Sequence, residues 1–92
     1  MTSASRPDGG PGAGAPDREL DLRGLKCPLP TLKTRAALKR MLAGRSLGVV
    51  ATDPMAAIDI PHLAAQLGDE LVEATEQDGV LRFVIRRRAT PR

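Results

Sequence analysis

The chain has 92 residues, a formal net charge of +3 at pH 7 and a hydrophobic fraction of 41%. A chain of this length forms one small domain with a thin core and no room for a buried substrate cavity. Cys27 is the only cysteine, and no apolar segment is long enough for a signal-peptide core or a membrane span. We therefore expect a cytoplasmic protein without a disulfide. Cys27 and His62 are too few for a structural zinc site, so neither a metal nor a cofactor is expected.

Both ends of the chain lack the apolar periodicity of a packed element. Residues 1–18 are rich in Gly, Pro, Ala and Ser, so nothing offsets the entropy cost of ordering them, and a disordered tail is predicted. Residues 89–92 are predicted to form a frayed basic tail. The folded domain is therefore expected to span residues 19–88.

The first predicted strand leads toward the cysteine. Residues 20–22 alternate apolar and polar side chains, which is typical of a short half-buried strand. Arg23 and Gly24 follow, and the glycine gives the turn its conformational freedom. Asp21 points away from the two leucines of this strand and is available to pair with a basic side chain.

A helix is predicted to begin directly after Cys27. Pro28 suits the first helical position, where its missing N–H would have no intrahelical partner, and Pro30 lies within the first turn. Good helix formers continue to about Leu42, and Gly44 is a stop signal. Cys27 therefore lies at or next to the helix N-cap.

This position predicts a reactive thiol. A helix N-terminus and nearby cations lower the pKa of a cysteine and raise its thiolate fraction. Lys26, Arg23 and Lys33 are near Cys27 in the sequence, so a depressed pKa is expected. The alternative is a structural role, because a lone cysteine is often a small buried hydrophobic residue.

Apolar residues occur on more than one side of this first helix. Leu38 and its neighbours form one face, whereas Leu29, Leu32 and Ala36 lie on another. The second group is either a partner surface beside the cysteine or part of a broad core face.

The middle of the chain predicts a second strand and a second helix. Residues 45–52 contain a β-branched run, and residues 54–67 read as a helix that starts at Pro54. Pro61 removes one backbone N–H, so a kink or two short helices are expected. Four apolar residues of this helix are expected to pack inward: Ile58, Leu63, Ala64 and Leu67.

Two aspartates near this helix are assigned structural roles. Thr52 or Asp53 can cap the helix, and short acidic side chains such as Asp59 favour capping and backbone hydrogen bonding. Neither aspartate is predicted to be catalytic.

The last predicted element is a β-hairpin. Gly68 ends the helix, and residues 71–75 are expected to pair with residues 80–86 around an Asp-Gly turn. Three residues of the last strand are assigned to the core: Leu81, Phe83 and Ile85. The order βαβαββ predicts an α/β fold, a two-layer sandwich with two helices on one face of a four-stranded mixed sheet. Arg82 and Arg86 would lie on its open face.

The excess positive charge belongs to the folded part of the chain. Basic residues flank the cysteine and end the last strand: Lys26, Lys33, Arg35, Lys39, Arg40 and Arg86 to Arg88. They are a candidate docking surface for an acidic partner or RNA, or simply solvated faces.

Residues 20–30, Leu-Asp-Leu-Arg-Gly-Leu-Lys-Cys-Pro-Leu-Pro, resemble the N-terminal motif of the TusA (SirA-like) sulfurtransferase family. In that motif a short strand leads through an Arg-Gly loop to a Cys-Pro-x-Pro helix start. Gly44, Asp53-Pro54 and Asp59-Ile60-Pro61 resemble the family's second half. The similarity covers about residues 19–88 and implies the same βαβαββ sandwich.

The resemblance implies a sulfur carrier that accepts a sulfane sulfur as a persulfide on Cys27. The donor would be a cysteine desulfurase or a rhodanese-like protein, and an acceptor protein would take the sulfur onward. The destinations it implies are tRNA thiolation, molybdenum-cofactor synthesis and sulfur oxidation. Arg23 and Lys26 would stabilise the persulfide anion and help to dock partners, together with Gly24 and Lys33. Pro28 and Pro30 would keep the group projecting.

Two other functions compete with the carrier. One is a regulatory module that binds RNA or an acidic protein without sulfur chemistry, although the near absence of aromatic residues leaves little for base stacking. The other is a redox-sensing thiol that forms a sulfenate with peroxide.

Overall fold

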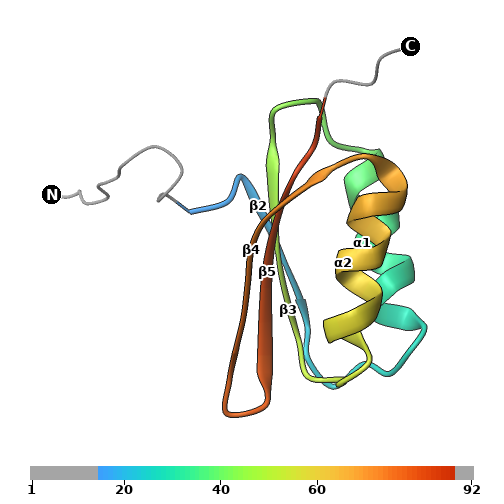
Figure 1. The fold of residues 1–92 in the computed structure, drawn as a ribbon, viewed down its shortest axis with the longest axis vertical. Coiled ribbons are helices and arrows are strands. Elements are labelled where there is room, and N and C mark those ends of the chain that lie inside the picture. Colours follow the sequence, from blue (N-terminus) through green and yellow to red (C-terminus); the bar gives the residue numbers. More distant parts are fainter. Residues whose placement is uncertain (1–14, 89–92) are drawn as a thin grey trace, which may run out of the picture.

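The computed structural model describes residues 15–88 of the chain (Figure 1). Of the tail predicted at residues 1–18, residues 1–14 lie outside this range, whereas its last residue, Arg18, begins the first strand. The tail predicted at residues 89–92 also lies outside it. Six elements follow one another: β2 (Arg18–Leu22), α1 (Leu29–Lys39), β3 (Ser46–Ala51), α2 (Ala56–Leu67), β4 (Glu70–Gln77) and β5 (Val80–Arg86). Their order is the predicted βαβαββ, and the first strand begins two residues before the predicted one.

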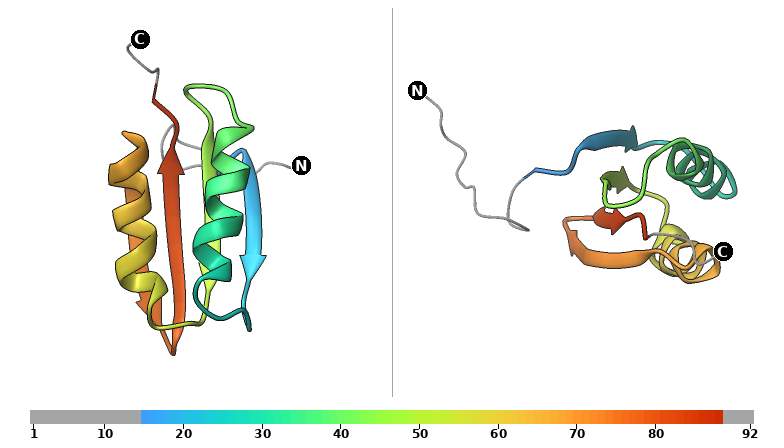
Figure 2. Two further views of the ribbon diagram at one scale, coloured as in Figure 1. Left: turned by 90° about the vertical axis from the view of Figure 1, so that its right-hand side faces the viewer. Right: turned by 90° about the horizontal axis from the view of Figure 1, so that it is seen from above.

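The four strands form one mixed sheet in the order β2-β3-β5-β4. β2 and β3 are parallel, whereas β5 is antiparallel to both β3 and β4. Both helices cover the same face of this sheet (Figure 2). The two-layer α/β sandwich predicted from the sequence is therefore confirmed. Within residues 15–88, neither helix has the length and apolarity needed to cross a bilayer.

The core lies between the sheet and the two helices. Leu81, Phe83 and Ile85 point into it as predicted, and they alternate with Arg82 and Arg86, which are exposed on the open face. The other buried apolar residues come from β2, β3 and the two helices: Leu22, Ala37, Leu38, Leu47, Val49, Ala51, Ala56, Ile60, Leu63 and Ala64.

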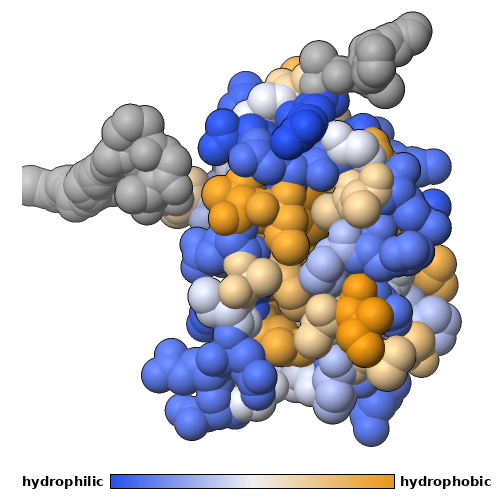
Figure 3. Space-filling model, viewed as in Figure 1, coloured by the Kyte–Doolittle hydropathy of each residue, from blue (hydrophilic) through white to orange (hydrophobic). Residues whose placement is uncertain are grey.

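β4 contributes little to this core. All but one of its residues are exposed, and it forms an edge of the sheet. Leu71 and Val72 remain 37% exposed there. Figure 3 shows hydrophobic surface over the upper part of β4 and over the lower half of α2, surrounded by hydrophilic residues.

α1 is shorter than predicted. It ends at Lys39, because the backbone N–H groups of Arg40 and Met41 turn back to carbonyls three residues earlier. The expected end at Leu42 is therefore wrong, and Leu42, beyond the helix, is 72% exposed. Gly44 instead serves the following loop, where its φ of +89° is easily adopted by glycine and its N–H donates to the Arg87 carbonyl.

α2 is a single helix, so of the two outcomes predicted at Pro61 the division into two short helices is wrong. Ile60, Leu63 and Ala64 are fully buried against the sheet, and this burial outweighs the hydrogen bond that the proline removes. Ile58 was expected to pack inward, but its side chain is 64% exposed.

The two glycine turns of the second half are where they were predicted. Gly68, with a φ of +75°, ends α2. Asp78 and Gly79 both have positive φ, at 54° and 80°, as a two-residue hairpin turn requires.

A largely buried ion pair joins the C-terminal ends of α1, α2 and β5. Arg87 Nε lies 3.1 Å from Asp69 Oδ2, and the Asp69 side chain is 1% exposed. The Arg87 guanidinium also donates to the Leu38 carbonyl, while Asp69 Oδ1 accepts the Arg88 N–H. Oδ2 has no well-aligned hydrogen bond, so it depends on the charge of Arg87. Arg87 is therefore part of a structural ion pair and not of the predicted basic surface run alone.

We predict that Arg87→Met lowers the free energy of unfolding by about 3 kcal/mol, because it leaves a buried carboxylate unpaired. Urea unfolding followed by circular dichroism measures this change. The matched control is Arg86→Met on the exposed face, for which a change below about 0.5 kcal/mol is expected. Equal stability of the two variants would contradict the structural role of the ion pair.

Candidate functional site

The loops that follow β2 and β3 meet at one edge of the sheet. The two strands are parallel, and Leu22 pairs with Ala51 at their ends, so both chains leave the sheet side by side. Gly24, with a φ of +85°, donates its N–H to Thr52 Oγ1 at 2.9 Å. This edge is also where α1 and α2 begin (Figure 1).

Asp53 connects the two loops through its carboxylate. Oδ2 accepts the backbone N–H of Cys27, and Oδ1 accepts that of Met55 at 3.1 Å. These hydrogen bonds lower the pKa of Asp53, with a smaller contribution from the charge of Lys26. The side chain caps the turn before α2, in agreement with the structural role predicted for it. It also fixes the backbone at the cysteine.

The Cys27 thiol is free and exposed to solvent. Its Sγ lies 3.6 Å from Asp59 Oδ2, in a contact where the thiol is the donor. Asp59 belongs to the first turn of α2. No group of three or more His, Cys, Asp or Glu side chains within residues 15–88 is arranged to hold a metal ion. The site is therefore a thiol paired with one carboxylate.

The pKa of Cys27 is raised, so the sequence-based prediction of a depressed pKa is wrong. Partial desolvation is the main cause, followed by the hydrogen bond to Asp59 and the charges of Asp59 and Asp53. Each of these effects favours the neutral thiol over the thiolate. Cations are near Cys27 along the chain, but the fold brings aspartates to it from a distant part of the sequence.

The start of α1 also differs from the prediction. The helix begins at Leu29, so Pro28 occupies the N-cap, and the Cys27–Pro28 peptide bond is cis. Pro30 lies in the first turn and is buried, whereas Pro28 is exposed. The two prolines lack the N–H groups that would otherwise point toward an anion here, which weakens the favourable effect of the helix end.

The predicted supporting cations do not gather around the thiol. Arg23 forms a bidentate ion pair with Asp21, with N–O distances of 2.8 and 2.7 Å. Asp21 was predicted to be available for pairing with a basic side chain. This pairing lowers the pKa of Asp21 to about 2. Lys33 instead lines a groove on the flank of α1. Of the predicted set, Lys26 is the cation whose charge acts on Asp53.

Apolar side chains are exposed at the starts of both helices. On α1 they are Leu29 and Leu32, at 44% and 52% exposure, and at α2 they are Met55 and Ile58, at 45% and 64%. Leu29 and Leu32 were predicted to form either a partner surface or part of a broad core face, and their exposure favours the accessible surface. These residues belong to the helix turns closest to Cys27 and Asp59 in the sequence.

We predict that Asp59→Asn lowers the pKa of Cys27, because the substitution removes the charged acceptor that stabilises the thiol form. The pH dependence of iodoacetamide alkylation measures this pKa, and the variant should react faster near neutral pH. Glu76→Gln, an exposed charge change on β4, is the matched control and should behave like the parent. An unchanged or higher pKa in Asp59→Asn would contradict this electrostatic description.

Comparison with known proteins places this site in a family. The model of the family described as "Sulfurtransferase TusA" matches residues 18–87. The chain is 44% identical over 71 residues to the sulfur carrier protein TusA of Allochromatium vinosum, covering 77% of this chain and 93% of the relative. It is 43% identical over 70 residues to a putative sulfur carrier protein of Archaeoglobus fulgidus, covering 75% and 91%.

A solved structure supports the fold. The crystal structure of a SirA-like protein from Desulfitobacterium hafniense superposes with a TM-score of 0.70 and covers 78% of this chain and 99% of that one. Its sequence identity is 24%, so it is evidence of a shared fold alone. The family match spans all six helices and strands, and it includes Cys27, Asp53 and Asp59. The chain therefore belongs to the TusA family of sulfurtransferases.

Proposed function

We propose that this protein is a sulfur carrier that holds a sulfane sulfur as a persulfide on Cys27. The observation that carries the proposal is the free, exposed Cys27 thiol beside the ends of the parallel strands β2 and β3. A thiol in that position can be approached by another protein, and the domain has no room to enclose a substrate of its own. The partners must therefore supply most of the chemistry.

The proposed transfer is an attack of sulfur on sulfur. The Cys27 sulfur forms a bond to the outer sulfur of a donor persulfide, R–S–SH, as the donor's S–S bond breaks. The products are Cys27–S–SH and the donor thiolate, R–S⁻, so no external oxidant or reductant is consumed. In the second half, an acceptor thiolate attacks the outer sulfur, and Cys27 leaves as a thiolate.

Asp59 is the proposed proton acceptor in the first step. The raised pKa keeps Cys27 protonated at rest, so the thiol proton must leave as the new S–S bond forms. Asp59 Oδ2, 3.6 Å from Sγ, is within reach of that proton. It can return the proton to Cys27 when the sulfur is passed on.

Docking is proposed to occur around the starts of both helices. The exposed apolar residues Leu29, Leu32, Met55 and Ile58 are the surface a donor or acceptor would cover. Covering them would exclude water from the thiol, and Lys26 would stabilise the persulfide anion. We propose a cysteine desulfurase or a rhodanese-like protein as the donor. The chemistry requires no oxidising compartment, so a cytoplasmic location fits.

Two competing functions fit the site less well. Oxidation by peroxide proceeds through the thiolate, and the aspartates beside Cys27 disfavour that form, which speaks against a redox sensor. An RNA-binding module would lack a stacking platform, because Phe83, the single aromatic residue, is 3% exposed.

We predict that incubation with a cysteine desulfurase and cysteine adds the mass of one sulfur atom to the protein. Intact-mass spectrometry measures the addition, which dithiothreitol should remove. The control is Cys27→Ala, which should gain no mass. The carrier proposal is wrong if the parent gains none, or if Cys27→Ala complements a deletion strain as well as the parent does.

A second prediction separates the effect of Asp59 on the pKa of Cys27 from its proposed role as proton acceptor. If Asp59 accepts the proton, Asp59→Asn should slow persulfide formation by about a hundred-fold, the low end for general acid–base catalysis. The same variant should be alkylated faster, so the two readouts move in opposite directions. Single-turnover transfer from a persulfidated donor measures the rate, with Glu76→Gln as control. If transfer accelerates together with alkylation, Asp59 is not the proton acceptor.

A further inference from the structure

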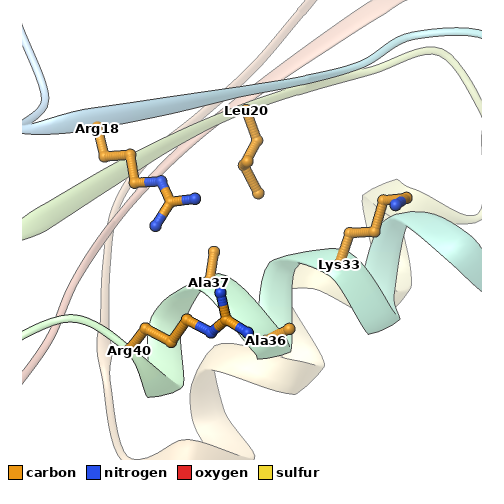
Figure 4. Close-up of a pocket in the computed structure, with 6 residues that line it drawn as sticks. All are labelled: Arg18, Leu20, Lys33, Ala36, Ala37 and Arg40. Carbon is orange, nitrogen blue, oxygen red and sulfur yellow. The ribbon is translucent and has the colours of Figure 1, made fainter.

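A groove lies between β2 and the flank of α1, separate from the Cys27–Asp59 contact (Figure 4). It encloses about 230 Å³ and is open to solvent. Three basic and three apolar side chains line it: Arg18, Leu20, Lys33, Ala36, Ala37 and Arg40. Arg18 and Leu20 point from β2 toward α1, and Ala37 points back toward them. The short alanine side chains leave the space open.

The basic residues of this groove have no acidic partner in the described part of the chain. The ion pairs formed within residues 15–88 involve Arg23, Arg45 and Arg87. No carboxylate lines the groove. Like charges gathered at one hollow repel one another, and a bound anion relieves that repulsion. The groove is therefore complementary to a negatively charged occupant.

The apolar residues in the lining of the groove favour an acidic peptide over a nucleic-acid backbone. Leu20 lies between the Arg18 end and the Lys33 end, with Ala36 and Ala37 opposite (Figure 4). An aliphatic side chain flanked by acidic ones would satisfy both the apolar and the basic parts. A nucleic-acid backbone would use the cations alone, and no aromatic side chain lines the groove to stack a base.

The edge strand β2 favours a ligand in an extended conformation. β2 is the outermost strand at this side of the sheet and pairs with β3 alone. Its outer backbone groups can therefore accept an added strand, a common mode of peptide recognition. Alternate residues of such a strand would face α1, as Arg18 and Leu20 do.

We propose that this groove binds an extended acidic peptide segment of a partner protein. Lys33 and Arg40 are seven residues apart, about 10 Å along a helix. Side chains at positions i and i+4 of an extended peptide are about 13 Å apart on one face, and long basic side chains span the difference. The expected motif has an acidic residue at each end and an aliphatic residue midway between them.

Titration of the full-length, isotope-labelled protein with a peptide containing Glu-Ser-Val-Ser-Glu tests this proposal. Backbone amide shifts in the NMR spectrum should concentrate in residues 18–22 and 33–40. The peptide with Lys in place of both Glu residues should not bind. Shifts spread over the open face around Arg82, or equal binding of the Lys peptide, would overturn the proposal.

Matched double variants separate the groove from general positive charge. Arg18→Gln with Arg40→Gln should weaken binding about five-fold or more, because it removes two of the three cations. Arg82→Gln with Arg86→Gln makes the same charge change on the open face and should leave the affinity unchanged. Equal losses in both would overturn the proposal, as would stronger binding of an oligouridylate of equal charge at the same residues. Thermal melts establish that both variants fold.

This binding does not depend on sulfur transfer. Cys27→Ala should bind the peptide as the parent does, although it accepts no sulfur. If instead the parent gains sulfur but ignores the peptide, the groove proposal fails while the carrier proposal stands.

Discussion

The parallel pairing of β2 with β3 is the constraint on which the site depends. Because both strands run in the same direction, their ends and the helix starts that follow them meet at one edge of the sheet. Cys27 and Asp59 are 32 positions apart in the chain and come into contact only there. The hydrogen bond from Gly24 to Thr52 and that from Cys27 to Asp53 hold the two loops together. Each hydrogen bond contributes about 1 kcal/mol, so the loop geometry relies on their sum.

Acidic and basic side chains gather in different parts of the domain. Aspartates face the thiol, Arg23 is neutralised by Asp21, and unpaired cations line the groove beside α1. The thiol is exposed, but the nearby aspartates keep it mostly protonated. The protonated form reacts slowly with small oxidants and electrophiles. For a carrier this combination is useful, because the sulfur is accessible to a docked protein and still unreactive toward the solvent.

The sequence predicted the fold in full outline and the site in part. Proline and glycine signals located the helix start after Cys27, the end of α2 at Gly68 and the Asp78-Gly79 turn. Alternation identified the buried face of β5. Where local signals competed with packing they failed, since burial of Ile60 and Leu63 keeps α2 continuous through Pro61.

The electrostatics of the site were not predictable from local patterns. Lys26 and Arg23 are the charges near Cys27 in the sequence, but its neighbours in space come from α2 and the turn before it. The βαβ order of the elements predicts that the two helices begin at the same end of the sheet. It does not say which side chain of α2 faces the thiol, because that depends on the helix rotation set by its buried face.

The distance between groove and thiol limits what an acidic partner can do to the sulfur. Arg18 and Arg40 lie toward the end of α1, and interactions between exposed charges are screened beyond about 8–10 Å at physiological ionic strength. Neutralising these cations would therefore leave the pKa of Cys27 nearly unchanged. Contacts near Asp53 and Asp59 are needed to alter it, through desolvation or an added positive charge. Recognition along the flank of α1 and activation at its start are thus separate events, and a peptide bound in the groove alone leaves the thiol in its protonated form.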